Sequence, residues 1–228
     1  MAWKKIQMTK VQEIKDIFIN KDLFDQSLTH RSWINENPGI RESNERLEFL
    51  GDAILEFVVS SDLYKKFSKE EGYLTALRSN IVNTTSLGEL GKRLNIGPHI
   101  FLSKGEGESG GRTNASLLAD TVEAIIGAIY IDQGLPKAQE FIHKNLLADV
   151  EAKATQPLKD SKSVLQELVQ AKSLPAPRYK VISESGPDHA KTFEVEVWVD
   201  SKSVGAGSGN SKSEAEQKAA EHGLEAFR

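Results

Sequence analysis

The sequence predicts two domains: an all-α domain over residues 1–152, a linker over 153–160 and a small α+β domain over 161–228. Up to about residue 150, apolar residues recur at helical spacing and no segment alternates as a strand does. Residues 153–160 include Pro157 and have the composition of a linker. Beyond the linker the patterns run helix, three strands, helix, which is typical of a small α+β fold.

The composition excludes several classes of protein. The chain has 228 residues and no cysteine, which excludes disulfides and cysteine-based metal sites and fits a cytoplasmic location. No apolar run is long enough to span a bilayer and the N-terminus lacks the apolar core of a secretory signal, so we expect no membrane association. The net charge of −4 argues against a generic nucleic-acid binder, so such a role must depend on local arrangement or on metal ions.

Helical periodicity predicts the elements of the all-α domain in order. Helices are expected over residues 9–20, 22–33, 44–67, 73–94, 115–131 and 137–152. The second of these contains His30, and a single histidine in such a place is more often structural than catalytic. The glycine-rich segment 103–114 predicts a mobile loop, and it is no phosphate-binding P-loop because no Gly-Lys-Ser/Thr follows it.

The helix expected over 44–67 carries a column of acids. With a step of about 100° per residue, four carboxylates fall within roughly 80° of one another: Glu45, Glu48, Asp52 and Glu56. The opposite side gathers apolar residues: Leu47, Leu50, Ile54, Phe57 and Val58. Like charges at this spacing repel, so the column requires neighbouring cations or a function. Taken alone, a solvated face is the favoured interpretation.

Two residues within the column argue against a plain solvated face. Gly51 stands mid-helix, where glycine costs about 0.5–1 kcal/mol relative to alanine. Phe49 lies on the acidic side and cannot join the core without burying acids, so it is better placed for contact with another surface.

The helix expected over 115–131 is nearly all apolar or small, so it should be buried. Its only charges are Asp120 and Glu123, three positions apart on one face, with Ala124 and Gly127 beside them. Because burying unpaired carboxylates is costly, two on one face of a core helix indicate a metal site or a cleft. The small neighbours would let another helix come close. For this pair the functional interpretation is favoured.

The C-terminal domain is predicted to contain two helices and three strands. The strands are recognised by alternating apolar and polar residues, and the last helix by its capping residues. A helix is expected over 163–171, strands over 178–184, 192–199 and 202–208, and a last helix over 213–227. Ser211 and Glu214 form a capping box that opens the last helix.

These motifs, in this order and spacing, resemble a known family. Residues 44–52 resemble the signature of the ribonuclease III family, and residues 29–32 and 118–124 match the same family. The tail resembles a double-stranded RNA-binding domain in three segments, 165–167, 186–189 and 211–220. The resemblance covers essentially the whole chain. It implies an endoribonuclease that cuts double-stranded RNA to 5′-phosphate and 3′-hydroxyl ends with short 3′ overhangs, in the processing of rRNA, mRNA and tRNA.

The resemblance also implies roles for the acids. Glu48, Asp120 and Glu123 would hold the metal, and Asp52 and Glu123 would be the positions most tied to catalysis. Ligation by carboxylates alone suits Mg²⁺, or Mn²⁺ in its place, rather than zinc. Further acids would line the RNA valley or stand behind the metal ligands: Glu45, Glu71 and Glu106.

A homodimer is a further implication of the resemblance. Family members work as homodimers in which each subunit cuts one strand, so two acidic sites join into one valley. Phe49 would then pack into a pocket on the partner subunit, which would explain an aromatic side chain next to a carboxylate column.

The RNA-binding residues of the tail follow from the same resemblance. Gln166 and His189 would enter minor grooves, whereas Ser211, Lys212 and Lys218 would meet the phosphates between them. Residues 158–228 nevertheless contain ten Lys/Arg and eleven Asp/Glu, and Ser213 stands where many relatives have lysine. We therefore expect modest RNA affinity of this domain alone and a shallow salt dependence.

The competing interpretation is a non-catalytic double-stranded RNA-binding protein on the same fold. A degenerate member should have lost one of the four central acids. All four are present, which favours the enzyme: Glu48, Asp52, Asp120 and Glu123.

Overall fold

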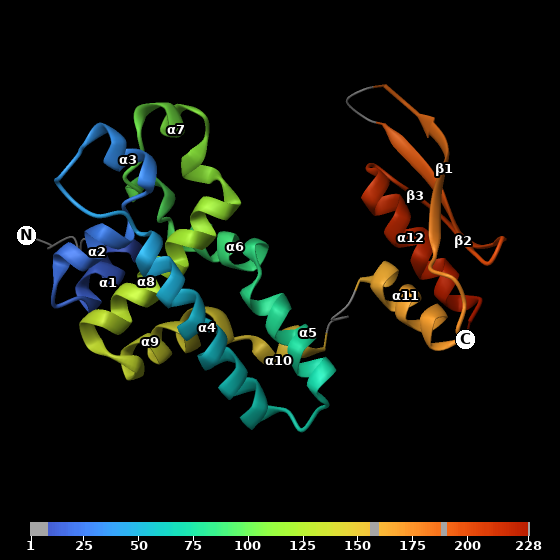
Figure 1. Ribbon diagram of the computed structural model, residues 1–228, viewed down its shortest axis with the longest axis horizontal. Helices are drawn as coiled ribbons and strands as arrows, with labels where there is room; N and C mark the ends of the chain where they lie inside the picture. Colours follow the sequence, from blue (N-terminus) through green and yellow to red (C-terminus); the bar gives the residue numbers. More distant parts are fainter. Residues whose placement is uncertain (1–8, 156–159, 188–190, 228) are drawn as a thin grey trace, which may run out of the picture. The chain divides into compact units, whose positions relative to one another are not determined.

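A computed structural model describes residues 9–155, 160–187 and 191–227 of the chain. The chain divides into two units, Met1–Gln156 and Pro157–Arg228, and each is described by itself (Figure 1). None of the helices in the described ranges is long and apolar enough to cross a membrane.

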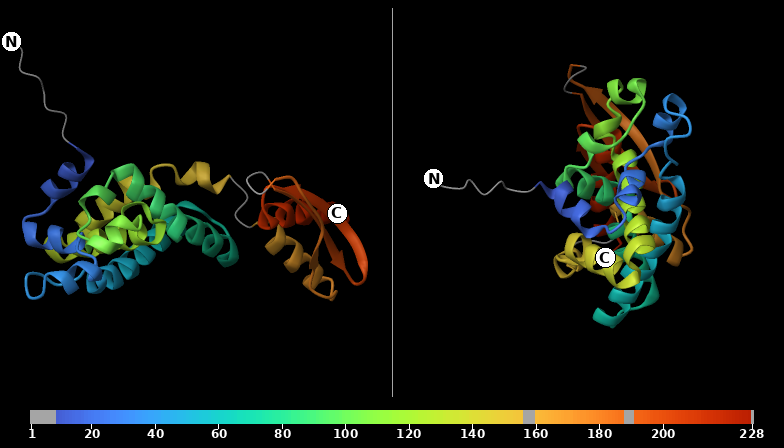
Figure 2. Two further views of the ribbon diagram at one scale, coloured as in Figure 1. Left: turned by 90° about the horizontal axis from the view of Figure 1, so that it is seen from above. Right: turned by 90° about the vertical axis from the view of Figure 1, so that its left-hand side faces the viewer.

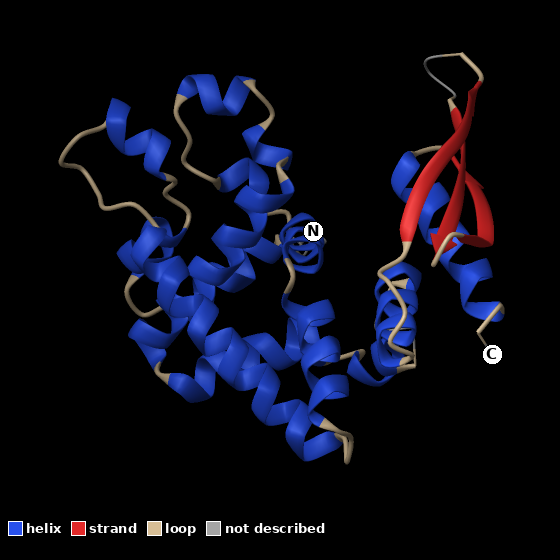
Figure 3. Ribbon diagram, turned by 45° about the vertical axis from the view of Figure 1, so that its right-hand side comes forward, coloured by secondary structure: helices blue, strands red, loops and turns tan. Residues whose placement is uncertain are grey.

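The N-terminal unit is built from helices, as predicted (Figure 3). They are α1 (Lys10–Ile17), α2 (Lys21–Ser27), α3 (Arg31–Glu36), α4 (Glu45–Lys66), α5 (Glu71–Val82), α6 (Thr84–Leu94), α7 (Lys104–Glu108), α8 (Ala115–Gln133), α9 (Leu135–Ile142) and α10 (Val150–Ala154). Two short 3-10 helices, Gly97–His99 and Gly111–Thr113, and a π-helix, His143–Leu147, complete it.

Helix α8 forms the centre of this unit. Eleven of its 19 residues are buried, so it is the core helix that its apolar sequence predicted. Helix α4 crosses it at two glycines. A Cβ atom on Gly51 would lie 1.8 Å from the carbonyl oxygen of Glu123, and one on Gly127 would lie 2.1 Å from that of Leu47. The two backbones therefore touch where only glycine fits, which explains the glycine in the middle of α4.

The buried face of α4 differs from the one expected. Leu47, Ile54 and Val58 are buried as predicted, together with Leu55 and Val59, but Phe57 is 58% exposed. The burial of Leu55 and Val59 shows that the apolar arc is rotated toward the acids. Phe57 is thereby left on the outer surface.

Three predicted helices are each split in the structure, and the one expected over 137–152 is divided into α9, a π-helix and α10. The helix expected over 22–33 breaks between α2 and α3, where the backbone of Leu28 accepts from Phe101 and that of His30 donates to it. The helix expected over 73–94 breaks at Asn83, whose side chain caps α6 by accepting from the N–H of Ser86 at 2.8 Å.

The glycine-rich segment 103–114 is not simply a loop. It contains α7, which Ser103 caps, and the short 3-10 helix Gly111–Thr113. Arg112 holds the segment in place by donating to the carbonyl oxygens of Gly97, Pro98 and Ile100. At the other end of the unit, α10 includes Lys153 and Ala154, which were expected in the linker.

The C-terminal unit has the predicted α-β-β-β-α order. Its elements are α11 (Ser161–Ala171), β1 (Arg178–Ser185), β2 (Thr192–Val199), β3 (Lys202–Gly209) and α12 (Lys212–Glu225). The strands form an antiparallel sheet in the order β1-β2-β3. Both helices pack on one face of it, around a core that includes Leu165, Val197 and Ala219 (Figure 2). The domain boundaries at 152 and 161 remain predictions.

Candidate functional site

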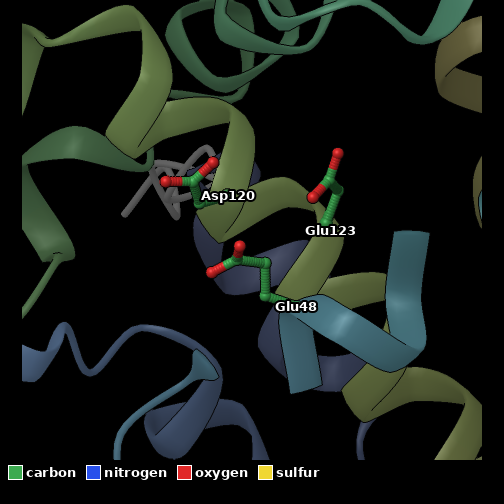
Figure 4. A group of neighbouring side chains, drawn as sticks. All are labelled: Glu48, Asp120 and Glu123. Atoms are coloured by element: carbon green, nitrogen blue, oxygen red, sulfur yellow. The ribbon is translucent and has the colours of Figure 1, made fainter. Parts of the chain in front are cut away.

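Three carboxylates from two helices converge in the N-terminal unit. Glu48 comes from α4, and Asp120 and Glu123 come from α8 (Figure 4). One side-chain oxygen from each lies within 4.8 Å of the others, which is close enough for one metal ion to contact all three. The glycine crossing explains the approach, because it brings the backbones of α4 and α8 together beside Glu123.

Cations neutralise the ends of the acidic column but not its middle. Arg31 lies 3.3 Å from the carboxylate of Glu45, and Arg78 lies 2.8 Å from that of Glu56. Glu48 and Asp52, between them, have no ion-pair partner among the residues that the structure describes. The middle of the column is therefore where a bound cation is needed.

The electrostatics of the cluster lead to the same conclusion. Burial, and then the charges of Asp52, Asp120 and Glu48, raise the pKa of Glu123 to about 8. Burial and then the charge of Asp120 raise the pKa of Glu48. Burial also raises the pKa of Asp120. The ionised form of all three carboxyls is therefore unfavourable in the free protein, and a bound divalent cation would stabilise it.

Asp52 stands beside the three acids rather than among them. Its side chain is exposed, and it is not part of the group whose oxygens lie within 4.8 Å. Its charge nevertheless helps to raise the pKa values of both Glu48 and Glu123. Asp52 therefore faces the cluster from the solvent side.

The other acids singled out in the sequence lie at different distances from the cluster. Glu45 borders it, since its charge helps to raise the pKa of Glu48. Glu106, in α7, packs its carboxylate beside Gly111. Glu71 begins α5, which follows the C-terminal end of α4. The length of α4 from Asp52 to its C-terminal cap, Phe67, alone is about 22 Å, so Glu71 is far from the cluster. The structure does not bring Glu71 to the cluster of its own subunit.

His30 is a neighbour of the cluster that sequence reasoning set aside as structural. Burial raises the pKa of the Asp120 carboxyl, and a positive charge on His30 offsets part of that rise. The Nδ1 atom also accepts from the N–H of Ser32 and caps α3. No local pattern could place residue 30 beside residue 120, although the motif at 29–32 was a signal that this segment is special.

Comparisons with known proteins identify the family. The family model described as ribonuclease-III-like matches residues 20–150, and the one described as double-stranded RNA binding motif matches residues 161–226. The protein named ribonuclease 3 from Natranaerobius thermophilus is 42% identical over 217 residues, 93% of each chain. Its namesake from Streptococcus pneumoniae (strain P1031) is 43% identical over 224 residues, 97% of each chain.

The chain belongs to the ribonuclease III family. A solved structure agrees: the nuclease domain of ribonuclease III from Campylobacter jejuni is 38% identical, with a TM-score of 0.55 over 62% of this chain and 99% of that one. The N-terminal unit is a ribonuclease III nuclease domain, and the C-terminal unit is a double-stranded RNA binding motif. The chain is thus an endoribonuclease of double-stranded RNA.

The RNA binding motif of this ribonuclease III displays most of the residues expected to contact RNA. Gln166 is exposed on α11, and Ser211 caps α12 by accepting from the N–H of Glu214. Lys212 and Lys218 are exposed on α12. His189 lies outside the described residues.

Proposed function

We propose that this chain is a Mg²⁺-dependent homodimeric enzyme that hydrolyses double-stranded RNA in the cytoplasm. It would leave 5′-phosphate and 3′-hydroxyl ends with short 3′ overhangs and act in the processing of rRNA, mRNA and tRNA. The convergence of Glu48, Asp120 and Glu123 supports the proposal most directly. A non-catalytic RNA-binding role is not favoured, since such a protein would not need to hold three uncompensated carboxylates together.

The donor set fits Mg²⁺, with Mn²⁺ as a substitute. All three groups are carboxylates, and the cluster includes no cysteine or histidine ligand that would favour zinc. Deprotonation of Glu123 is opposed by its neighbours, so a divalent cation is the natural counter-charge. In this site Glu48, Asp120 and Glu123 would hold the ion.

The chemistry divides between the ion and the protein. When bound, Mg²⁺ would supply Lewis acidity toward the phosphate and would lower the pKa of the attacking water. Glu48, Asp120 and Glu123 would hold the ion at the point where the two helices meet. Asp52, on the solvent side of the cluster, would accept a hydrogen bond from that water and orient it. Glu45 and Glu106 would border the RNA.

An apolar stripe on α4 supports the homodimer. Phe49 is 81% exposed, Phe57 58% and Tyr64 79%. On a helical wheel the three fall within roughly 80° of one another, and so large an exposed apolar surface is typical of an interaction site. The relative from Campylobacter jejuni was itself solved in a study of a region involved in dimer formation.

The spacing of the stripe suggests how two copies would pair. Phe49 lies about 12 Å along the helix from Phe57, and Tyr64 lies about 10 Å on the other side. A two-fold axis near Phe57 would therefore place Phe49 opposite the partner's Tyr64 and the residue that follows it. A cavity of about 840 Å³ opens there, lined by residues that include Leu63, Phe67 and Leu74.

The same pairing would give Glu71 a role. Glu71 borders that cavity, so the partner's Glu71 would come to lie beside Phe49 and hence near the acidic cluster. In this arrangement Glu71 lines the RNA valley of the other subunit, which a single subunit could not achieve.

The C-terminal unit would bind the duplex by its shape. Gln166 and His189 would reach minor grooves, and Ser211, Lys212 and Lys218 would meet the phosphates between them, at the N-terminal end of a helix whose dipole favours anions.

Incubation with a long perfect RNA duplex tests the proposed function. With Mg²⁺ we expect short duplex products whose ends carry 5′-phosphate and 3′-hydroxyl groups, and with EDTA we expect none. Products with 3′-phosphate ends, or equal cleavage in EDTA, would contradict the proposal.

A further inference from the structure

The two lysines that are expected to contact RNA phosphates each form an ion pair with a carboxylate of the same domain. The ammonium group of Lys212 lies 2.8 Å from the carboxylate of Glu184, and that of Lys218 lies 2.9 Å from the carboxylate of Glu214. Both lysines and both acids are exposed, so RNA could reach either pair. Two of the eleven acids in residues 158–228 are thus located beside these cations.

The pair at Lys212 joins three elements of the domain. Lys212 begins α12, Glu184 lies near the end of β1, and the ammonium group also stands 5.5 Å from the ring centre of Phe193 on β2. The hydrogen bond from Lys212 lowers the pKa of Glu184, so this acid stays ionised at neutral pH. The ammonium group of Lys212 is therefore held against the domain's own surface.

The pair at Lys218 belongs to the start of the same helix. Glu214 lies four residues before Lys218, and its other oxygen accepts from the backbone N–H of Asn210 at 2.9 Å. That second bond fixes the carboxylate at the N-terminal end of α12, where the phosphate would have to bind. Glu214 therefore has a structural contact that a glutamine could keep while losing the charge.

Pairing is not a general consequence of the acid-rich composition. Arg178 and Lys180 project from β1 and have no ion-pair partner within the described ranges. Lys180 stands opposite Glu196 in the register, so an acid on the neighbouring strand does not by itself make an ion pair. Lys162 pairs with Glu216, and Lys212 and Lys218 are the paired lysines at the expected RNA surface.

We propose that Glu184 and Glu214 compete with RNA phosphates for Lys212 and Lys218, and so set the affinity and salt dependence of RNA binding. The inference rests on the proposed function, in which these lysines contact phosphates. An arriving phosphate must displace the carboxylate or share the lysine with it, and the displaced carboxylate remains close enough to repel the RNA.

Two variants remove the carboxylate that pairs with each lysine, and a third variant controls for the change in net charge. Glu184→Gln and Glu214→Gln each remove one negative charge beside a lysine. Asp200→Asn removes one from the turn after β2, and asparagine tolerates the positive φ of 46° found there. Asp200 lies seven residues along β2 from Phe193, which is about 23 Å, far beyond a Debye length of about 8 Å in physiological salt.

Binding of the full-length protein to an RNA duplex of about 20 base pairs, which spans the successive grooves that such a domain contacts, tests the inference. EDTA prevents cleavage, and the dissociation constant is measured at several salt concentrations. Because exposed ion pairs are weak, we expect each glutamine variant to bind about two- to five-fold more tightly. The plot of the logarithm of the association constant against the logarithm of the salt concentration should become steeper, by an amount that corresponds to up to about one additional released counterion. Asp200→Asn should match wild type.

Lys212→Ala separates failure of the inference from failure of the proposed function. If this variant binds RNA more weakly but neither Glu184→Gln nor Glu214→Gln differs from Asp200→Asn, the competition is overturned while the RNA contact stands. If Lys212→Ala and Lys218→Ala both bind as wild type does, the proposed contacts are wrong and the inference falls with them. Duplex cleavage by wild type tests the enzymatic function independently of either result.

Discussion

At the scale of single residues, Glu123 carries the least favourable charge of the acidic cluster. Burial is the largest cause, and repulsion from Asp52, Asp120 and Glu48 adds to it, so the pKa rises from 4.5 to about 8. Glu123 is thus held by the fold in a position where its charged form is unfavourable without a cation. A metal ion would reverse that balance.

The pKa of Glu123 predicts how the stability of the metal-free protein depends on pH. A carboxyl whose pKa is raised on folding stabilises the fold while protonated, and this contribution is lost as pH rises from about 4.5 to about 8. Since the side chain is half-exposed and screened by solvent, we expect a loss of about 1–2 kcal/mol. Glu123→Gln should lack this loss. Urea unfolding in EDTA at pH 5 and pH 8 measures the difference.

Addition of Mg²⁺ provides the control for this prediction. At pH 8 the ion should raise the free energy of unfolding of the wild type, and it should do so much less for Glu123→Gln. Parallel stability curves for the two proteins across the pH range would show that Glu123 is not strained in the way described.

The grouping of the site residues could be largely predicted from the sequence. Asp120 and Glu123 stood out because they are the only charges on an apolar helix, and Glu48 because it lies in an acidic column. The position of His30 beside Asp120 could not be predicted, since it depends on the contact between Phe101 and residues 28–30. The functional roles of these residues remain proposals.

At the scale of elements, the crossing of α4 and α8 positions the site. Gly51→Ala would place a Cβ atom 1.8 Å from the carbonyl oxygen of Glu123, so the helices would have to separate. We expect a net destabilisation of about 1–3 kcal/mol by overpacking together with weaker metal binding. Thermal unfolding and Mg²⁺ titration measure the two effects.

Gly72→Ala is the matched control for the helix crossing. Gly72 lies in α5, where an added Cβ meets nothing within 4 Å. This variant should be neutral or more stable by up to about 1 kcal/mol, because alanine favours the helix. If Gly51→Ala proved as stable as Gly72→Ala, the close approach of α4 and α8 would be refuted.

Element boundaries could be predicted less well than element types. Between Ile81 and Leu87 the apolar spacing jumps by six residues, which is out of phase with one continuous helix, and Asn83 lies in the gap. That signal was present in the sequence. The break between α2 and α3 had no such signal, because a strand-like bridge from Thr29 to Phe101 imposes it. The helix α7 was missed because glycine-rich sequence favours loops, whereas Arg112 and Ser103 hold the segment by polar contacts.

At the scale of the whole molecule, dimerisation through α4 predicts a strong effect of Phe49→Ser. Burial of a phenylalanine contributes about 1.5–3 kcal/mol, and a symmetric dimer would bury two. We therefore expect the dimer dissociation constant to rise by at least roughly 100-fold. Sedimentation measures it. Ile19→Ser, at a residue that is 79% exposed outside α4, should leave the dimer unchanged. An equal effect of both variants would contradict the proposed interface.

Deletion of residues 156–228 tests the division of labour between the two units. Because the nuclease unit contains the whole acidic cluster, the truncated protein should retain cleavage chemistry at saturating RNA while it binds duplex RNA more weakly at physiological salt. Cleavage rates as a function of RNA concentration separate the two effects. If the truncated protein bound as tightly as the full chain, the C-terminal unit would not be the binding module.

We propose that Glu48, Asp120 and Glu123 form the metal centre that cuts duplex RNA. The most direct test compares wild type with Glu123→Gln on one RNA duplex, measuring the cleavage rate in Mg²⁺ and the dissociation constant in EDTA. We predict that cleavage is abolished while the dissociation constant changes little. Cleavage by Glu123→Gln at a rate near that of wild type would contradict the assignment of the metal centre.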